Sequence, residues 1–211
     1  MTVTASEPTV FVVEADAPLR DSVVALVQGA GLRAEAFPSA GDFLRAFEPH
    51  RPGCIVLDVR APDGAGMNLQ EHLRSQPYSP PILMLTDHCD VATAVRAMDH
   101  GAFDFIQRPV KGMLLLERIR AALALDAKRR ADRAQHAHLR VRLDGLSKRE
   151  REVLEIVVAG HSNKIVAERL GISTKTIEVH RAHAIKKMKA RNLAGLVKMA
   201  VALEVTSATP E

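Results

Sequence analysis

Residues 54–58 read CIVLD, four apolar side chains in a row that end in an acid. Residues 81–86 read PILMLT, a second apolar run, which ends in a hydroxyl. Strands that are apolar on both faces are typical of a parallel sheet covered by helices on both sides. Because parallel strands end at the same edge of a sheet, the two runs also predict that Asp58 and Thr86 lie near one another.

The segments around these two runs alternate between strand-like and helix-like patterns. Strands are expected at residues 10–13, 33–37, 54–58, 81–86 and 103–107, and helices at 19–31, after Ser39, at 68–74, at 91–101 and after Pro109. This order predicts an α/β doubly wound sheet of five parallel strands, of the flavodoxin type. Ligands bind such sheets beyond the carboxyl ends of the strands. The residues expected there are Glu14, Ala15, Asp16, Asp58, Thr86 and Arg108.

The second half of the chain is expected to be all helical. One long helix is predicted over residues 114–141, which are rich in Ala and Arg and contain neither Pro nor Gly. Ser147 and Glu150 have the spacing of a capping box, which begins another helix. Helices at 163–173 and 174–189 follow each other as in a helix-turn-helix. We expect one domain over residues 8–125, a helical linker over 126–144 and a four-helix domain over 145–207.

Charge divides unevenly between the two halves. Residues 1–125 carry 11 Lys or Arg and 15 Asp or Glu, a net charge of −4, whereas residues 126–211 carry 18 and 10, a net charge of +8. A basic helical half suits a polyanion such as double-stranded DNA, although a merely solvated basic surface is the alternative. The chain begins without the features of a signal peptide, and no apolar run approaches the ~20 residues that span a bilayer. A cytoplasmic protein without a membrane partner is expected.

A helical wheel divides residues 174–189 into two faces. Ile177, Ala184, Ile185 and Met188 cluster on one side and are expected to pack on the domain. The opposite side combines lysines with small side chains, which suits the major groove of DNA: lysine can meet phosphate or guanine, and valine a thymine methyl. Its members are Lys175, Val179, Ala182 and Lys186, with Glu178 and His183 beside them.

The stretch LSKREREVLEIVVAGHSNKIVAERLGISTKTIEVHRAHAIKKMKARNLAGLVKMAV, residues 146–201, resembles the four-helix DNA-binding domain of the LuxR/NarL class. In this class the fourth helix, here from Asn192, commonly pairs two subunits, so the resemblance implies a homodimer on paired half-sites. Arg181 fits less well, because the wheel puts it near the packing side. The resemblance implies backbone contacts from Lys164, Thr174, Thr176 and Lys187, and groove-facing positions at Lys175, Glu178, Val179 and Ala182.

The first half resembles a response-regulator receiver domain of the CheY-like fold over about residues 10–125, and the FixJ group in particular. The motifs are VVEADAPLRDSV, IVLDVRAPDGAGMNL, LTDHCDVATAVRAM and GAFDFIQRPV. Receivers hold Mg²⁺ with two adjacent acids after the first strand and a phosphoacceptor aspartate after the third, while a hydroxyl residue and a lysine bind the phosphoryl group. The resemblance assigns the first acid to Glu14, the phosphoacceptor to Asp58, the hydroxyl to Thr86 and the aromatic that moves with it to Phe105.

Two positions depart from that pattern. Ala15 stands where the second acid would bind the metal, so Glu14 and Asp58 form a weak Mg²⁺ site at best. Asp16 is one residue further on and would point to the opposite face of a strand, although a loop shift could bring it back. Arg108 stands where the lysine would be, and its broad planar guanidinium could form a standing ion pair with Asp58.

Two functional readings follow from these departures. In the first, the chain is a DNA-binding transcriptional regulator whose degenerate receiver is controlled largely without ordinary Mg²⁺-dependent phosphorylation, and no cofactor is required. In the second, a sensor histidine kinase phosphorylates Asp58 in the conventional way. An enzyme is not expected, because an aspartate-nucleophile phosphatase usually has a second acid where Arg60 stands. Cys89, near the same pocket, could sense redox state but is more simply an inert thiol.

Overall fold

In the computed structural model of the chain, the described residues are 7–59, 65–76, 78–87 and 91–205. The chain divides into two compact units, Met1–Arg129 and Arg130–Glu211. The division falls within one long helix, α5 (Gly112–Asp144), which runs through the whole of the predicted linker. None of the helices in the described ranges combines the length and the apolar character that a membrane span needs.

The first unit is built on a sheet of five parallel strands in the order β2-β1-β3-β4-β5. This is the predicted flavodoxin-like sheet, and its direction of winding reverses between β1 and β3, where ligands bind in such folds. The prediction of the fold class is therefore confirmed. The strands are β1 (Thr9–Val13), β2 (Arg33–Phe37), β3 (Gly53–Asp58), β4 (Ile82–Thr86) and β5 (Asp104–Gln107).

Both faces of the sheet are covered, because alternate side chains of the central strands enter two separate apolar clusters. Phe11 and Met84 belong to one cluster, which includes side chains of α2, α3 and α4. Val12 and Leu85 belong to the other, which includes side chains of α1 and the first part of α5. These helices are α1 (Ala17–Gly29), α2 (Ala40–Ala46), α3 (Ala65–Arg74) and α4 (Val91–Asp99).

The start of β3 is held by a close backbone approach and by α5. A Cβ atom on Gly53 would lie 2.0 Å from the carbonyl oxygen of Thr9, so a larger residue cannot fit there without moving the backbone. The amide of Gly53 donates to Oδ2 of the buried Asp126 over 3.0 Å. This hydrogen bond fixes α5 to the base of the sheet, at the opposite ends of the strands from Asp58.

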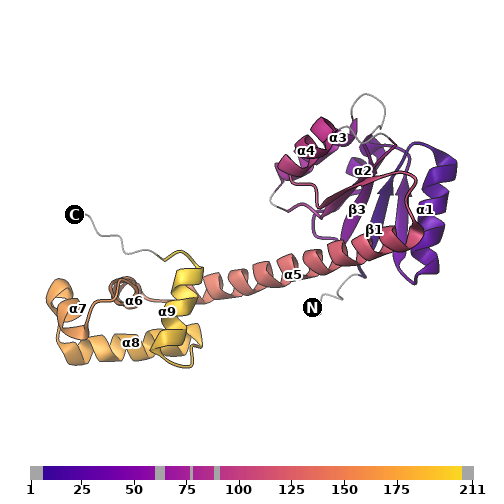
Figure 1. Ribbon diagram of the computed structural model, residues 1–211. Coiled ribbons are helices and arrows are strands. Elements are labelled where there is room, and N and C mark those ends of the chain that lie inside the picture. Colours follow the sequence, from indigo (N-terminus) through magenta and orange to yellow (C-terminus); the bar gives the residue numbers. More distant parts are fainter. Residues whose placement is uncertain (1–6, 60–64, 77, 88–90, 206–211) are drawn as a thin grey trace. The chain divides into compact units, whose positions relative to one another are not determined.

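The second unit contains four short helices, α6 to α9, after the end of α5 (Figure 1). The predicted capping box is present: Ser147 accepts from the amide of Glu150, and Glu150 accepts from the amide of Ser147. Gly171 ends α7 with a left-handed φ of 65°, and Ser173 caps the next helix. The helices are α6 (Lys148–Val158), α7 (Asn163–Leu170), α8 (Thr174–Met188) and α9 (Leu193–Ala202).

Candidate functional site

The carboxyl ends of four strands gather acidic, hydroxyl and cationic side chains at one edge of the sheet. Glu14 follows β1, Asp58 ends β3, Thr86 ends β4, and Arg108 comes directly after β5. The side chains of Glu14, Asp58 and Thr86 are buried. The parallel register brings these positions together, because it places Asp58 level with Leu85 and Thr86 level with Gln107.

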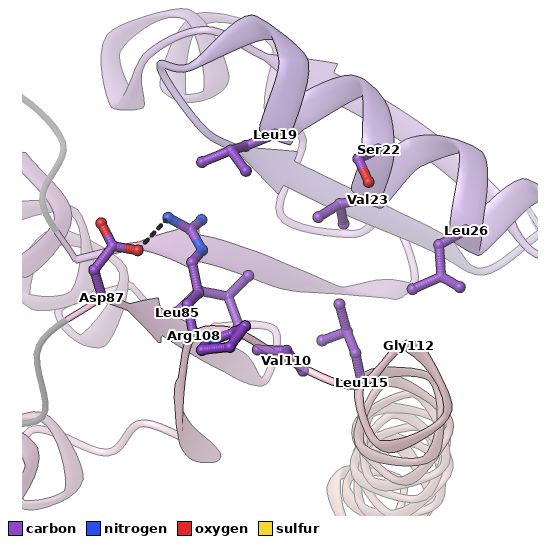
Figure 2. Close-up of a pocket in the computed structure, with 11 residues that line it drawn as sticks. Leu19, Ser22, Val23, Leu26, Leu85, Asp87, Arg108, Val110, Gly112 and Leu115 are labelled. Atoms are coloured by element: carbon purple, nitrogen blue, oxygen red, sulfur yellow. Dashed lines mark hydrogen bonds and ion pairs between the residues drawn. The ribbon is translucent and has the colours of Figure 1, made fainter.

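Arg108 is the centre of the contacts at this edge. Its Nη2 donates to Oε2 of Glu14, and its Nη1 lies 3.8 Å from Oδ1 of Asp58. The same Nη1 lies 3.5 Å from Oδ1 of Asp87, a contact drawn in Figure 2. The Arg108 side chain is only 14% exposed, so these ion pairs are shielded from water. The guanidinium thus bridges Glu14, Asp58 and Asp87, whereas the sequence suggested Asp58 alone.

Asp16 serves a different purpose from the missing acid. Its Oδ1 accepts from the amide of Leu19 over 2.9 Å and caps α1, which explains why that helix begins at Ala17. Its own amide donates to Oε1 of Glu14 over 3.0 Å. Its position therefore follows from helix capping, whereas the sequence argument relied on strand alternation. Ala15 has an exposed side chain, and its carbonyl accepts from Arg20.

The donor set at this edge fits Mg²⁺ poorly as it stands. The two carboxylates that remain from the receiver pattern, Glu14 and Asp58, both face the Arg108 guanidinium. Within the described ranges, no group of three or more His, Cys, Asp or Glu side chains could hold a metal ion. A hard divalent cation needs several oxygen ligands, and here a cation of the protein itself occupies the same carboxylates.

Phe105 lies on β5 and is partly buried against the cluster that includes α2, α3 and α4. Its predicted movement together with Thr86 stays a prediction. Cys54 is fully buried in β3, and burial raises the pKa of its thiol, which makes it unreactive. Cys89 and Arg60 lie outside the described residues.

Helix α8 presents the second candidate surface. Of the side chains that the wheel places inside, Ile177, Ala184 and Met188 are buried and Ile185 is partly buried. Val179 on the opposite side is 47% exposed. Ser173 accepts from the amide of Thr176 over 3.0 Å, so the first turn of α8 is capped by a side chain. The exposed residues of the predicted DNA-binding set are Lys164, Thr174, Lys175, Glu178, Val179, Ala182, Lys186 and Lys187, whereas Thr176 is partly buried.

Three polar contacts fix α8 to the helices behind it. Lys187 Nζ donates to Oε2 of Glu150 over 2.7 Å, and His183 Nδ1 lies 3.7 Å from Oε1 of the same carboxylate. Arg181 donates to the Oδ1 atom of Asn163 on α7, in agreement with its place near the packing side. Burial alone would raise the pKa of Glu150, but hydrogen bonds from Lys187 and Ser147 outweigh it and hold that pKa below its usual value.

Sequence reasoning missed the partners of these site residues. Asp87 was not singled out, although it directly follows Thr86 at a strand end, which is a signal that the sequence does contain. The pairing of Lys187 with Glu150 joins residues 37 positions apart and has no local signal. Lys187 was expected to contact DNA, and its observed partner is a carboxylate of its own unit.

Comparisons with known proteins agree with both halves of this description. The model for the response regulator receiver domain matches residues 10–120, and the model for bacterial regulatory proteins of the luxR family matches residues 144–200. Nodulation protein W of Bradyrhizobium diazoefficiens is 39% identical, over 94% of this chain and 87% of that protein. Transcriptional regulatory protein FixJ of Rhizobium meliloti is 41% identical, over 92% of this chain and 95% of that protein.

Two solved structures extend the similarity to the full chain. The response regulator StyR has a TM-score of 0.80 and 38% identity, covering 93% of this chain and 99% of its own. Full-length FixJ from B. japonicum has a TM-score of 0.56 and 36% identity, covering 94% of this chain and 98% of its own.

Proposed function

The chain belongs to the response regulators that join a receiver to a LuxR-type DNA-binding domain, and we propose that Arg108 largely removes this receiver from ordinary phosphorylation control. As a member of this family, the chain is a two-component transcriptional regulator that binds DNA. The proposal concerns how its receiver is set. The observation that carries it is the contact of one guanidinium, on a side chain only 14% exposed, with both Glu14 and Asp58.

The physical reason is competition for the same two carboxylates. Mg²⁺ would need both of them together with the acid that Ala15 has replaced. Removing Arg108 from them would break ion pairs in a site of low exposure, where the pairing is stronger than at the surface. The receiver therefore rests with Glu14 and Asp58 paired to a side chain of its own, and its state is set mainly by dimerisation, a protein partner or the amount of protein.

Phosphorylation of the purified chain tests this proposal. The chain is incubated with acetyl phosphate or phosphoramidate and Mg²⁺, and its intact mass is measured over time. We expect little or no gain of one phosphoryl group in the parent chain. Rapid and nearly complete labelling that disappears in Asp58→Ala would contradict the proposal. A related regulator with both acids and the lysine in place shows that the phosphodonor works.

Conventional control by a sensor histidine kinase is the second candidate. It is favoured by the buried Asp58 and Thr86 at adjacent strand ends, which are the phosphoacceptor and hydroxyl positions of the receiver pattern. It is also favoured by relatives that carry the names of transcriptional regulators. The same mass measurement separates the candidates, because conventional control requires stoichiometric labelling at Asp58.

On the DNA side, we infer that α8 enters the major groove of double-stranded DNA with Lys175, Glu178, Val179, Ala182 and Lys186 toward the bases. Their exposure on one side of a helix that is buried on the other supports this assignment. Lys164, Thr174 and Thr176 are assigned to phosphates around the start of the helix. Lys187 is assigned to a phosphate that competes with Glu150. Two copies of the chain are assigned to paired half-sites.

A further inference from the structure

Glu178 is an exposed carboxylate on a helix whose other charged side chains are basic. Its neighbours one turn away along α8 are Thr174 and Ala182, which carry no charge. The cations closest to it along the helix are Lys175 and Arg181, three residues before and three residues after it. A pair with either cation would satisfy this carboxylate within α8.

Neither pair is formed. Arg181 donates instead to Oδ1 of Asn163 on α7. Lys175 precedes Glu178, which is the less favourable order for an ion pair on a helix. Among the described residues, the side chain of Glu178 takes part in no hydrogen bond or ion pair. The carboxylate is therefore open to a donor that a ligand of α8 brings.

The major groove of DNA offers a carboxylate few partners. Phosphate groups repel it, and guanine and thymine present hydrogen-bond acceptors at their major-groove edges. Cytosine presents the N4 amino group, which donates to a carboxylate. Adenine has an amino donor as well, but its N7 acceptor lies beside that donor and faces the same side chain. Cytosine is thus the base that satisfies a glutamate in the groove best.

We infer that Glu178 selects cytosine in the half-site and does so mainly by penalising other bases. This inference rests on the proposed entry of α8 into the major groove, and it names the base that one side chain recognises there. The carboxylate lowers the affinity for any DNA, because it approaches a polyanion. Only at a cytosine does a hydrogen bond offset this loss, so the residue widens the difference between correct and incorrect sites.

Base preferences of variants test the inference. The full chain selects bound fragments from random DNA at low salt, and sequencing gives the preference at each position. Cytosine should be favoured over guanine about tenfold in the parent at the position of Glu178. Glu178→Ala should abolish this preference and raise the affinity for unrelated DNA. Glu178→Gln should change the preferred base to adenine, because glutamine pairs with N6 and N7 of adenine.

Two further variants check the position and the role of charge. Val179 is 47% exposed beside Glu178, and Val179→Ala should weaken a thymine preference. That thymine should lie within about two base pairs of the cytosine, since consecutive Cα atoms are about 3.8 Å apart and successive base pairs about 3.4 Å. Glu168→Gln is the matched control: it removes the same charge from an exposed position of α7 and should leave the base preferences unchanged.

Three results would overturn the inference while leaving DNA binding by α8 in place. The first is a preference for another base at the position that responds to Glu178→Ala. The second is an unchanged set of selected sites with both Glu178 variants, when circular dichroism shows that they are folded. The third is the same change of preference with Glu168→Gln. A parent chain that selects no sites at all would instead overturn the assignment of α8 to the groove, and this inference with it.

Discussion

Ala15 and Arg108 are the two residues proposed to weaken this receiver's Mg²⁺ site, and both can be changed to the residue types that the receiver pattern has there. Ala15→Asp together with Arg108→Lys restores the second acid and replaces the planar fork with a compact ammonium group. We expect the double variant to bind Mg²⁺. At ten times the dissociation constant, binding adds about 1.4 kcal/mol to the stability of the folded state. For a unit of this size the midpoint of thermal unfolding then rises by roughly 5 °C.

The comparison that decides this prediction is between the parent and the variant. The parent chain should show no shift of its thermal unfolding midpoint at the same Mg²⁺ concentration. A sample with NaCl at the same ionic strength separates Mg²⁺ binding from a general salt effect. Equal behaviour of both chains would contradict the proposal that Ala15 and Arg108 weaken Mg²⁺ binding.

Asp16 tests whether a displaced acid can replace the missing one. Asp16→Ala removes the side chain that accepts from the amide of Leu19, and should cost about 1 kcal/mol of stability in urea unfolding. Asp16→Asn keeps the cap and removes the charge, so it should cost little. Introduced into the double variant, Asp16→Asn should leave Mg²⁺ binding intact. A loss of Mg²⁺ binding there would make Asp16 a metal ligand after all.

At the scale of elements, Glu150 joins α6 to α8. It caps the start of α6 and holds Lys187 near the end of α8, while only 4% exposed. Glu150→Gln keeps the shape but loses the charge, and should cost about 1 to 2 kcal/mol at pH 7. The folded-state pKa of Glu150 is lowered, so its contribution is present above the unfolded pKa and disappears as the pH falls through the folded value.

The pH dependence therefore distinguishes Glu150 from an ordinary surface acid. The stability difference between parent and Glu150→Gln, measured by urea unfolding, should be largest near neutral pH and shrink below about pH 4.5. Glu152→Gln on the same helix breaks only an exposed pair with Arg149 and should have little effect at either pH. A Glu150 effect that is equally large at pH 3 would assign its role to shape alone.

The helices and strands could be predicted from the sequence because their signals lie in short stretches of neighbouring residues. The strand at 33–37 was placed at the residues where it is found, and the apolar runs of β3 and β4 were placed within one residue. Helix α7 ends at Leu170, where the turn over residues 170–173 is predicted, because Gly171 adopts a left-handed conformation that stops the helix. Contacts between segments that are far apart in the sequence could not be predicted from it. Arg108 contacts Glu14, Asp58 and Asp87 together, because its side chain reaches across the ends of three strands. Such reach has no signal in the local sequence.

At the scale of the whole molecule, the two halves of the chain differ in net charge, and the basic second half is the one that suits DNA. Residues 126–211 carry a net charge of +8, whereas residues 1–125 carry −4. Roughly five phosphate contacts from one copy predict that log affinity falls with log salt concentration at a slope of about −4 to −5. A dimer on paired half-sites should double that slope, to about −9. Sites selected by the protein from random DNA provide matched fragments with one or two half-sites.

Helix α9 supplies the variant that tests the dimer. Val201 is 59% exposed on this helix, which is expected to pair two subunits, so Val201→Asp should disturb pairing without unfolding the unit. On paired half-sites its salt slope should fall to the value for one half-site, as measured by fluorescence anisotropy of labelled DNA. Lys198→Glu, another charge change on α9, shows whether added negative charge alone explains the result. A slope of about −9 that survives Val201→Asp would place the dimer contact outside α9, and a slope near zero in the parent chain would contradict phosphate binding altogether.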